Sequence, residues 1–498
     1  MNSVFINGQW VASENSGTFH AYNPLTGDTV GEDFPVSSWA DCEKAMLAAA
    51  EADEECRDWP AARFADFIEA YVEEIIARTD DLVETAHQET GLPAEGRLRN
   101  GELQRTINQL KLAAEACRSE QWKEPVTDEA NGLFARQESL GPALLIGPNN
   151  FPYAYNSIAG GDFAAAVAAG NPVIAKSHPL HPNTSRIFAE AVEVAMKKTD
   201  MPSGFVQMLY HMEPEDGLNM IRDSHIAAVS FTGGKPAGMA IKQAADESGT
   251  PVYLEMSSLN PVFLHPNALK ERASDIAGEF LGSNFLGCGQ FCTNPGLLVA
   301  IDNEDLAAFL SAVTENYSEA DPGVMLSSGG VESYHGALQK IKNSGAEVLC
   351  TRAANSGAGA WPEATLLKIS GSQFLEAPSE FQEEAFGPSS LVVAVESIDQ
   401  MVEVATLLHG NLTAGQYIAS NGEDDETARH MVSILRRKAG RLLVNRMPTG
   451  VAVSPAMNHG GPYPATGHPR FSAVGFPASI ARFTKLTCYD HVPENLRA

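Results

Sequence analysis

The sequence predicts an α/β protein with two doubly wound parallel-sheet domains and a small β ribbon. The first observation behind this prediction is that short apolar runs of strand length alternate with helix-like segments, in two successive series. The second is the length of 498 residues, which suits about three structural units at roughly 150 residues each. Because such alternation requires crossover connections, the strands within each series are expected to run parallel.

The chain is expected to begin with helices, followed by a hairpin. Apolar residues recur at three- and four-residue steps between about residues 40 and 120, which is the spacing of one helix face. Residues 121–141 then contain an Asn131-Gly132 turn between two extended segments, a pattern typical of a β-hairpin. The apolar positions of the helical stretch include Phe64, Phe67, Ile68, Tyr71, Ile75 and Ile76.

Two series of strand-like runs follow the hairpin. The first series consists of ALLIG (143–147), NPVIAKS (171–177), FVQML (205–209), AAVSFTG (227–233) and PVYLEM (251–256). The second consists of PVFLH (261–265), PGLLVAI (295–301), SLVVAV (390–395), TAGQYIAS (413–420) and GRLLVN (440–445). From about Met447 the chain is rich in Gly, Pro and aromatic residues without periodicity, which predicts ordered loops and a terminal extension.

The composition argues against several classes of protein. With 34 basic and 63 acidic residues the net charge is -29, which repels a nucleic-acid backbone and an anionic membrane surface. We therefore expect neither nucleic acid nor a membrane as a partner. Seven cysteines without regular spacing do not indicate the disulfide framework of a secreted protein, and the N-terminus shows no secretory signal. The expected compartment is the cytoplasm.

Cys292 is the candidate nucleophile. It lies in the glycine-rich segment GCGQFCTNPG (287–296), between a helix-like and a strand-like stretch. Glycines allow a ligand to approach the backbone closely, and a thiolate there can attack a carbonyl carbon. An isolated cysteine is more often a small buried apolar residue. That interpretation is kept for Cys288, which is assigned no role.

Two polar residues at strand ends are candidate partners of the thiol. Glu255 ends the run PVYLEM, where α/β folds place functional groups and where a carboxylate can activate water. Asn149 and Asn150 follow the run ALLIG, and a side-chain amide there can donate to an oxyanion. Considered alone, the glutamate is more often a solvated or paired charge, and the asparagines are more often turn residues.

The segment FTGGKPAG (231–238) is the candidate phosphate-binding turn. It leads from a strand end through glycines into a helix, whose free amides suit a pyrophosphate. Gly233 and Gly238 are five positions apart, so the segment lacks the dinucleotide fingerprint and also fits an ordinary βα turn. Lys176 presents an ammonium at the same sheet edge, although most lysines of this kind are simply exposed. No closely spaced His, Cys and carboxylate residues indicate a metal site.

Ordered motifs along essentially the whole chain resemble those of the aldehyde dehydrogenase superfamily. These motifs are PNNFP (148–152), KSHP (176–179), FTGG (231–234), LEMSS (254–258), GQFC (289–292) and EEAFGP (383–388). The resemblance implies that Cys292 forms a thioester with an aldehyde and that Asn150, with the backbone amide of Cys292, holds the oxyanion. It implies that Glu255 activates the water that hydrolyses the thioester, although LEMSS replaces the family's common glycine pair after the glutamate.

The resemblance also implies a nicotinamide cofactor, NADP or NAD. Its contacts would be made by Lys176 and Ser177 at the adenosine ribose, Gly233, Gly234 and Gly238 at the pyrophosphate, and Glu384 and Phe386 at the nicotinamide ribose. His178 occupies the position where many members that prefer NAD have a glutamate. Because that carboxylate would repel a 2′-phosphate, its replacement slightly favours NADP.

The resemblance further implies a division of the chain into domains and a homo-oligomer. Its segments are 1–120 (helical opening and part of the cofactor-binding domain), 121–141 (oligomerisation hairpin), 142–256 (cofactor-binding domain), 257–446 (catalytic domain), 447–476 (return segment to the cofactor domain) and 477–498 (oligomerisation arm). We expect a homodimer or a homotetramer built from dimers.

Within the superfamily, the sequence looks most like 2-oxoglutarate semialdehyde dehydrogenases and related bacterial NADP-dependent fatty aldehyde dehydrogenases. The segments that indicate this are PNNFPYAYN, IAGGDF (158–163), GQFCTNPG and HGGPYPAT (459–466). The expected reaction is oxidation of 2-oxoglutarate semialdehyde to 2-oxoglutarate. A medium- or long-chain fatty aldehyde or another semialdehyde is the alternative substrate. Two other classes remain open: a cysteine-dependent ester hydrolase or acyltransferase without nicotinamide, and a non-catalytic binding protein.

Overall fold

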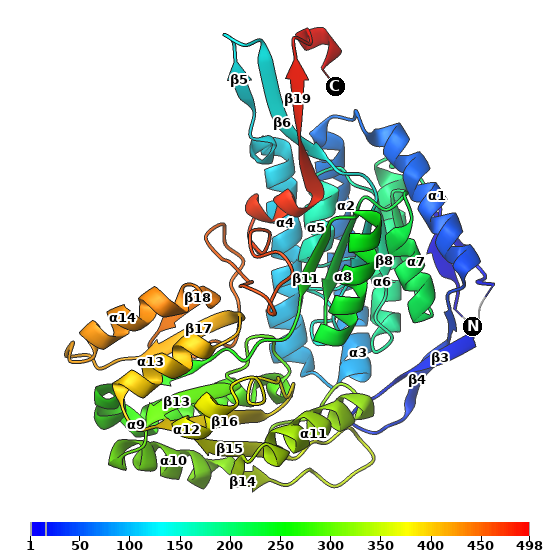
Figure 1. Ribbon diagram of the computed structural model, residues 1–498. Helices are drawn as coiled ribbons and strands as arrows, with labels where there is room; N and C mark the ends of the chain where they lie inside the picture. Colours follow the sequence, from blue (N-terminus) through cyan, green and yellow to red (C-terminus); the bar gives the residue numbers. More distant parts are fainter. Residues whose placement is uncertain (1, 15–16, 498) are drawn as a thin grey trace.

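The computed structural model describes residues 2–14 and 17–497 (Figure 1). The predicted segments 1–120 and 477–498 therefore include residues 1, 15, 16 and 498, which lie outside the described residues. The described strands form two seven-stranded sheets, one three-stranded sheet and one two-stranded sheet. This architecture confirms the predicted α/β class with two parallel-sheet units and a small β ribbon.

The first large sheet contains all five strands of the first predicted series. They are β7 (Ala143–Ile146), β8 (Val173–Lys176), β9 (Val206–Leu209), β10 (Ala228–Thr232) and β11 (Val252–Glu255). These strands are mutually parallel. Two N-terminal strands, β1 (Val4–Ile6) and β2 (Gln9–Val11), extend the sheet in the antiparallel sense, giving the order β11-β10-β7-β8-β9-β1-β2.

The strand order of this sheet reverses at β7, which places two predicted motifs side by side. β7 pairs with β8 on one side and with β10 on the other. Ligands of such sheets bind in the crevice at the carboxyl ends of the strands where the order reverses. The segments that leave β7 and β10, PNNFP and FTGG, are therefore neighbours at this crevice.

Helices cover this sheet and confirm most of the predicted helical opening. They are α1 (Trp39–Cys56), α2 (Ala61–Ala77), α3 (Thr79–Thr90), the π-helix η1 (Ala94–Leu103), α4 (Gln104–Ser119), α5 (Gly161–Ala168), α6 (Pro182–Lys198), α7 (Pro214–Arg222) and α8 (Lys235–Ser248). The predicted apolar positions of α2 are buried from Phe64 to Ile75, whereas Ile76, at the end of the series, is 49% exposed. The described residues before α1 form strands, including the two-stranded sheet of β3 (Gly17–Tyr22) and β4 (Thr29–Val36).

The second large sheet contains the five strands of the second predicted series. They are β12 (Val262–Leu264), β13 (Leu297–Ile301), β16 (Ser389–Val395), β17 (Asn411–Tyr417) and β18 (Ala439–Val444). Two further strands, which the sequence analysis missed, are β14 (Glu347–Arg352), which is antiparallel, and β15 (Ala364–Ser370). The order is β14-β15-β16-β13-β12-β17-β18. The accompanying helices are α9 (Pro266–Asn284), α10 (Glu304–Tyr317), α11 (Ser328–Asn343), α12 (Gly371–Glu376), α13 (Ile398–Leu407) and α14 (Asp425–Leu435).

The three-stranded sheet joins the predicted hairpin to the C-terminal arm. Its strands are β5 (Val126–Asp128), β6 (Leu133–Ser139) and β19 (Thr484–Asp490), in the order β19-β6-β5. The predicted hairpin is confirmed, and Gly132 takes a φ of 66° in its turn. Figure 1 shows this sheet projecting from the body of the molecule, beside the C-terminus. The short 3-10 helices are η2 (Gln121–Lys123), η3 (Leu286–Gly289), η4 (Ala478–Phe483) and η5 (Glu494–Leu496).

The apolar cores lie on the two large sheets. One cluster of buried side chains covers the first sheet and its helices, and two further clusters pack against the second sheet. Strands covered on both faces become continuous apolar runs, which is why these strands were predictable from sequence. In the described part of the chain, every helix is too short or too polar to cross a membrane.

Candidate active site

Cys292 lies on a loop that precedes β13, between the two large sheets. Asn260 fixes this loop, because its Nδ2 donates to the carbonyl oxygens of Cys292 at 2.8 Å and of Asn294 at 2.9 Å. Gly289 lets the loop approach its neighbour, since a Cβ atom there would lie 2.2 Å from the Gly387 carbonyl oxygen. β13 and β16 are parallel neighbours, so the Cys292 loop and the Glu384 segment before β16 meet at one sheet edge.

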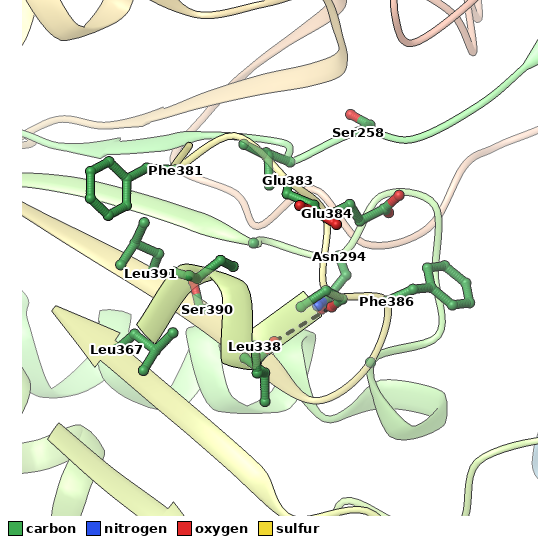
Figure 2. A pocket seen from close by; sticks show the side chains of 16 residues that line it. Ser258, Asn294, Leu338, Leu367, Phe381, Glu383, Glu384, Phe386, Ser390 and Leu391 are labelled. Atoms are coloured by element: carbon green, nitrogen blue, oxygen red, sulfur yellow. Dashed lines mark hydrogen bonds between the residues drawn. The ribbon is translucent and has the colours of Figure 1, made fainter. Parts of the chain in front are cut away.

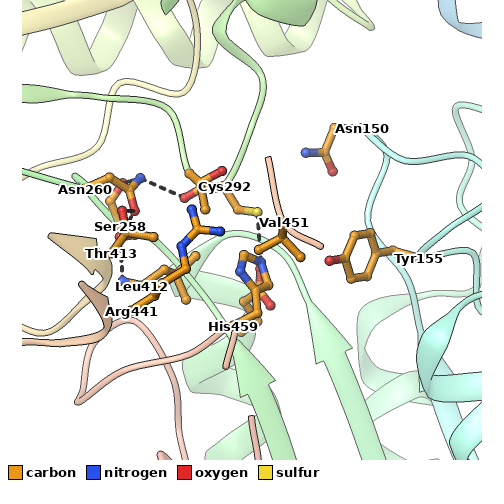
Figure 3. A network of polar contacts seen from close by, with 12 residues as sticks. Asn150, Tyr155, Ser258, Asn260, Cys292, Leu412, Thr413, Arg441, Val451 and His459 are labelled. Atoms are coloured by element: carbon orange, nitrogen blue, oxygen red, sulfur yellow. Dashed lines mark hydrogen bonds and ion pairs between the residues drawn. The ribbon is translucent and has the colours of Figure 1, made fainter. Parts of the chain in front are cut away.

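The sulfur of Cys292 contacts a histidine that the sequence analysis did not single out. His459 Nε2 lies 3.1 Å from the Cys292 sulfur and 3.0 Å from Oε1 of Glu255. The His459 side chain is only 2% exposed and that of Glu255 15%. Figure 3 shows His459 directed at the sulfur. A single ring nitrogen therefore connects the thiol to the carboxylate.

Backbone pairing explains how His459 reaches this position. The segment after it runs beside β11, with Met256 N donating to Ala465 O at 2.8 Å and Gly467 N donating to Leu254 O at 3.0 Å. Because Glu255 is the residue between these two contacts, the pairing brings the His459 segment to the carboxylate. The Cys292, His459 and Glu255 ligand atoms lie within 4.8 Å of one another, and they are of the types that bind zinc. The three residues are far apart in the sequence, so their spacing did not predict this cluster.

The environment of Cys292 keeps its thiol protonated at neutral pH. Burial raises its pKa well above the ordinary value, and the nearby carboxylates of Glu255 and Glu384 raise it further. The guanidinium of Arg105 acts in the opposite direction. A buried thiol of raised pKa needs an adjacent base to become a nucleophile. His459 and Glu255 are both positioned to accept its proton.

Asn150 is buried beside the Cys292 loop. Its Nδ2 donates to the carbonyl oxygen of Gln290 at 2.8 Å, and Arg97 donates to its backbone carbonyl at 3.1 Å. A side-chain amide nitrogen has two hydrogens, so the bond to Gln290 leaves one N–H for a substrate oxygen. Asn149 lies in the wall of a cleft beside Cys292.

The cleft that opens beside Cys292 has a volume of about 1070 Å³ and is lined by half of the predicted cofactor-contact residues. Its wall includes Cys292, Glu255, Asn150, Gly233, Gly234, Glu384 and Phe386. Figure 2 shows Glu384 and Phe386 on one segment, close to Asn294, whose Nδ2 donates to Gly387 O at 3.3 Å. Burial raises the pKa of Glu384 to about 8. Motifs from both sheets therefore meet around one cavity of cofactor size.

Comparison with known proteins agrees with this arrangement. The profile described as "Aldehyde dehydrogenase family" matches residues 10–474. The chain belongs to the aldehyde dehydrogenase family. Alpha-ketoglutaric semialdehyde dehydrogenase 2 of Azospirillum brasilense is 39% identical to this aldehyde dehydrogenase over 98% of this chain and 94% of its own. Alpha-ketoglutaric semialdehyde dehydrogenase of Acinetobacter baylyi is 35% identical over 99% and 94%.

Solved structures share the fold of this aldehyde dehydrogenase. An aldehyde dehydrogenase C mutant of Pseudomonas syringae, determined with NAD+ and octanal, has a TM-score of 0.82 at 22% identity and covers 99% of this chain and 98% of its own. Lactaldehyde dehydrogenase of Escherichia coli has a TM-score of 0.83 at 21% identity, covering 98% of both chains. These structures show the fold, whereas the family match and the two relatives above 30% identity identify the chain as an aldehyde-oxidising, nicotinamide-dependent enzyme.

Lys176, Ser177 and His178 lie together at the end of β8, outside the lining of the large cleft. Burial lowers the pKa of Lys176 to about 8. The pKa of His178 is far below its ordinary value because the ring is buried, and the neighbouring His181, Lys176 and His211 lower it further. The ring is therefore neutral at pH 7. The Ser177 hydroxyl is buried and has no hydrogen-bond partner among the described residues, which fits a site completed by a ligand.

The glycines after β10 have different surroundings. Gly234 is the N-cap of α8, so this helix directs its free amides into the cleft, where an anion is favoured. Gly238 lies outside the lining of that cleft. A Cβ atom at Gly238 would lie 2.8 Å from the sulfur of Met256, so its missing side chain allows α8 to pack closely. Cys288 is buried, and its thiol donates to Gly323 O at 3.5 Å.

His459 is the main residue that sequence reasoning missed. It begins the segment HGGPYPAT, which indicated the subfamily but was assigned no chemistry. It lies 167 positions from Cys292, within a stretch that has no helix or strand periodicity. A histidine next to two glycines was the available signal, because glycines permit close packing around a functional side chain.

Proposed function

We propose that this aldehyde dehydrogenase oxidises 2-oxoglutarate semialdehyde to 2-oxoglutarate through a thioester on Cys292. The chemistry is supported by the contact of the Cys292 sulfur with His459 at 3.1 Å, at the wall of the large cleft. The substrate is supported by two relatives, 39% and 35% identical over nearly the whole chain, both of which are named for this semialdehyde.

Acylation begins with removal of the thiol proton of Cys292. This step is needed because burial raises the pKa of the thiol and keeps it protonated. His459 Nε2 accepts the proton as the sulfur bonds to the aldehyde carbon and the carbonyl π electrons move to oxygen. The oxyanion receives hydrogen bonds from the second N–H of Asn150 and from the backbone N–H of Cys292. A nicotinamide held in the cleft would supply the acceptor for the hydride that leaves the former aldehyde carbon.

Deacylation depends on Glu255, whose carboxylate lies within 4.8 Å of the Cys292 sulfur. Glu255 accepts a proton from water while the water oxygen adds to the acyl carbon. The carbon–sulfur bond then breaks, releasing the carboxylic acid and a thiolate. His459, 3.0 Å from Glu255, returns a proton to the thiolate or shares the proton of the carboxyl group.

The cofactor is proposed to be NADP or NAD, with NADP slightly favoured. Ser177, Lys176 and His178 would bind the adenosine ribose, and the amides at Gly233 and Gly234 would bind the pyrophosphate. His178 Nδ1 accepts a hydrogen bond from Leu180 N at 3.2 Å, so a neutral ring has its proton on Nε2. That N–H suits a 2′-phosphate oxygen, whereas a glutamate in its place would repel the phosphate.

The division of the chain, its assembly and its compartment are part of the same proposal. The predicted segments 142–256 and 257–446 are assigned to cofactor binding and catalysis, and 447–476 returns to the first sheet. The projecting sheet of 121–141 and 477–498 would join copies into a homodimer or a tetramer of dimers. Val126 and Leu486 on it are each 63% exposed, as an interface requires. The seven free cysteines suit the cytoplasm.

A second candidate function is ester hydrolysis without nicotinamide. It is favoured by the Cys292–His459–Glu255 contacts, since a cysteine activated by a histidine is also the arrangement of cysteine hydrolases. The two functions differ in one readout. A dehydrogenase produces reduced cofactor in proportion to the aldehyde consumed, whereas a hydrolase cleaves an activated ester and leaves aldehydes unchanged.

A substrate and cofactor panel tests the proposal. Purified enzyme is assayed with 2-oxoglutarate semialdehyde, succinate semialdehyde and dodecanal, each with NAD and with NADP, by absorbance of the reduced cofactor. The highest kcat/KM is expected for 2-oxoglutarate semialdehyde. A clear preference for dodecanal would overturn the substrate, and ester cleavage without any aldehyde oxidation would overturn the reaction.

A further inference from the structure

Two arginines hold the loop at residues 448–451 beside Cys292. Arg105, on α4, donates from Nη1 to Val451 O and from Nη2 to the Tyr155 hydroxyl, both at 3.0 Å. Arg441, on β18, donates from Nη1 to Gly450 O at 2.7 Å and from Nη2 to Pro448 O. Arg105 comes from a helix that covers the first large sheet and Arg441 from a strand of the second, and both side chains bind the same loop.

Both guanidinium groups lie within electrostatic reach of the catalytic sulfur. Arg105 is among the groups that act electrostatically on Cys292, and Cys292 is among those that act on Arg441. Figure 3 shows Arg441 extending from β18 toward Cys292, with Tyr155 on the other side of the sulfur. Arg105, Cys292 and Glu255 all act on Tyr155 as well. These contacts place the arginines around the reaction centre.

Neither arginine is paired with a carboxylate among the described residues; their hydrogen-bond acceptors are backbone carbonyls, the Gln109 amide and the Tyr155 hydroxyl. Arg97, on the neighbouring η1, provides the contrast because it pairs with Glu102 at 3.3 Å. In a chain with 63 acidic and 34 basic residues, two partly buried cations without a counter-charge are unexpected.

The missing counter-charge is costly, which points to a ligand. A cation removed from water is stabilised only by an opposite charge and by full hydrogen bonding. Burial lowers the pKa of Arg441, and its buried Nε lacks a hydrogen-bond partner in the described structure. The Tyr155 hydroxyl accepts from Arg105 and has its own proton to donate. An anion between these groups would supply the missing charge and acceptors.

We infer that Arg105, Arg441 and Tyr155 form an anion-binding subsite for the distal carboxylate of the aldehyde substrate. The inference rests on the proposed aldehyde oxidation and deepens it, because it makes the enzyme selective for short aldehydes that end in a carboxylate. The aldehyde carbon is held at the Cys292 sulfur, and the carboxylate is held by the two guanidinium groups. A neutral aldehyde of the same length makes the contact with Cys292 but has no carboxylate for the guanidinium groups to bind.

A matched pair of substrates tests the subsite. 5-Oxopentanoate and pentanal have the same carbon number and differ in one carboxylate. The wild-type enzyme is expected to prefer 5-oxopentanoate, and Arg441→Met to lower kcat/KM for it by about 10- to 100-fold, mainly through KM. Pentanal should change by less than about threefold. Arg436→Met is the control, because Arg436 is an exposed arginine just before β18, and it should leave both values unchanged.

The same variants separate a ligand-binding role from a structural one. If Arg441 only holds the 448–451 loop, Arg441→Met lowers the values for 5-oxopentanoate and pentanal by the same factor, and the subsite is overturned. Arg441→Lys, which keeps the charge, should recover part of the preference for the carboxylated substrate. Should Arg441→Met fail to fold, as judged by circular dichroism and cofactor binding, Arg105→Met is compared with Arg105→Lys in the same assay.

Inhibition by glutarate distinguishes failure of the subsite from failure of the proposed substrate. Glutarate is not oxidised, and it should compete with pentanal in the wild-type enzyme about 10-fold more tightly than in Arg441→Met. If this holds while the enzyme rejects 2-oxoglutarate semialdehyde, the subsite stands and the proposed substrate fails. If glutarate inhibits both proteins equally, the subsite fails whatever the natural substrate is.

Discussion

The cofactor side and the aldehyde side of Cys292 are built in different ways. The proposed cofactor side consists of glycines and of residues next to strand ends, such as Gly233, Gly234 and Glu384, which line the large cleft. The aldehyde side is formed by long side chains from separate segments, including Arg105, Tyr155 and His459. The proposed pyrophosphate contacts rely on backbone amides, whereas the aldehyde side relies on titratable and charged side chains.

This difference separates the groups proposed to bind the cofactor from the groups proposed to carry out the reaction. The backbone N–H groups at a helix start keep their partial positive charge at every pH, and changing a side chain does not remove them. Side chains such as His459 move protons, and their replacement changes rates. Substitutions on the aldehyde side should therefore alter turnover while leaving the cofactor in place, and the reverse should hold for the nucleotide end.

The largest expected effect is that of Cys292→Ala. Without the sulfur no thioester forms, so aldehyde oxidation should fall by at least about 10⁴-fold. NADP binding, measured by fluorescence titration, should change little, because the amides of the cofactor side are untouched. Cys288→Ala is the matched control: it removes a buried thiol from the same loop and should retain oxidation. Turnover by the Cys292 variant would remove the nucleophile from the proposal.

The next effect is that of His459→Ala. Its Nε2 is the base in contact with the Cys292 sulfur, so acylation should slow by about 10³-fold. Because burial and Glu255 raise the pKa of the thiol, loss of this base should move the rise of activity to higher pH. Stopped-flow measurement of reduced cofactor follows the step, and added imidazole should restore part of the rate. His468→Ala is the control, since that exposed ring packs on Phe471 at 4.8 Å.

Glu255→Gln should have a smaller effect, of about 100-fold on steady-state turnover. His459 remains near the sulfur as an alternative base, so the first half-reaction continues while hydrolysis of the thioester slows. A burst of reduced cofactor equal to the active-site concentration should therefore precede a slow linear phase. A slow rise without a burst would assign the carboxylate to acylation instead.

The two sides also differ in how far the sequence predicted them. Cys292, Glu255 and the cleft glycines belong to short contiguous motifs next to apolar strands, so strand prediction placed them at sheet edges. His459 and Arg441 reach the site through contacts between distant segments. The bond from Arg105 to Val451, for example, spans 346 positions. Local propensity has no information on such contacts.

The fold shows the same limit. Strands buried on both faces, such as β16, appear as unbroken apolar runs and were predicted. β14, with the sequence EVLCTR, is partly exposed at the sheet edge, and its polar residues conceal it. β3 and β4 pair outside the large sheets, so their mixed burial produced no continuous apolar pattern and no strand was predicted there.

The smallest expected effect concerns the pH dependence of cofactor choice. Burial lowers the pKa of Lys176 to about 8, so its ammonium is present at pH 7 and lost as the pH rises through 8. The positive charge attracts the 2′-phosphate of NADP strongly, whereas it attracts the uncharged ribose hydroxyl of NAD less. The KM for NADP relative to NAD should therefore rise up to about fivefold between pH 7 and 9.5. Lys176→Gln should make the ratio independent of pH. A wild-type ratio that does not change over this range would show that Lys176 does not contact the phosphate, and the preference would then depend on His178, which is already neutral at pH 7.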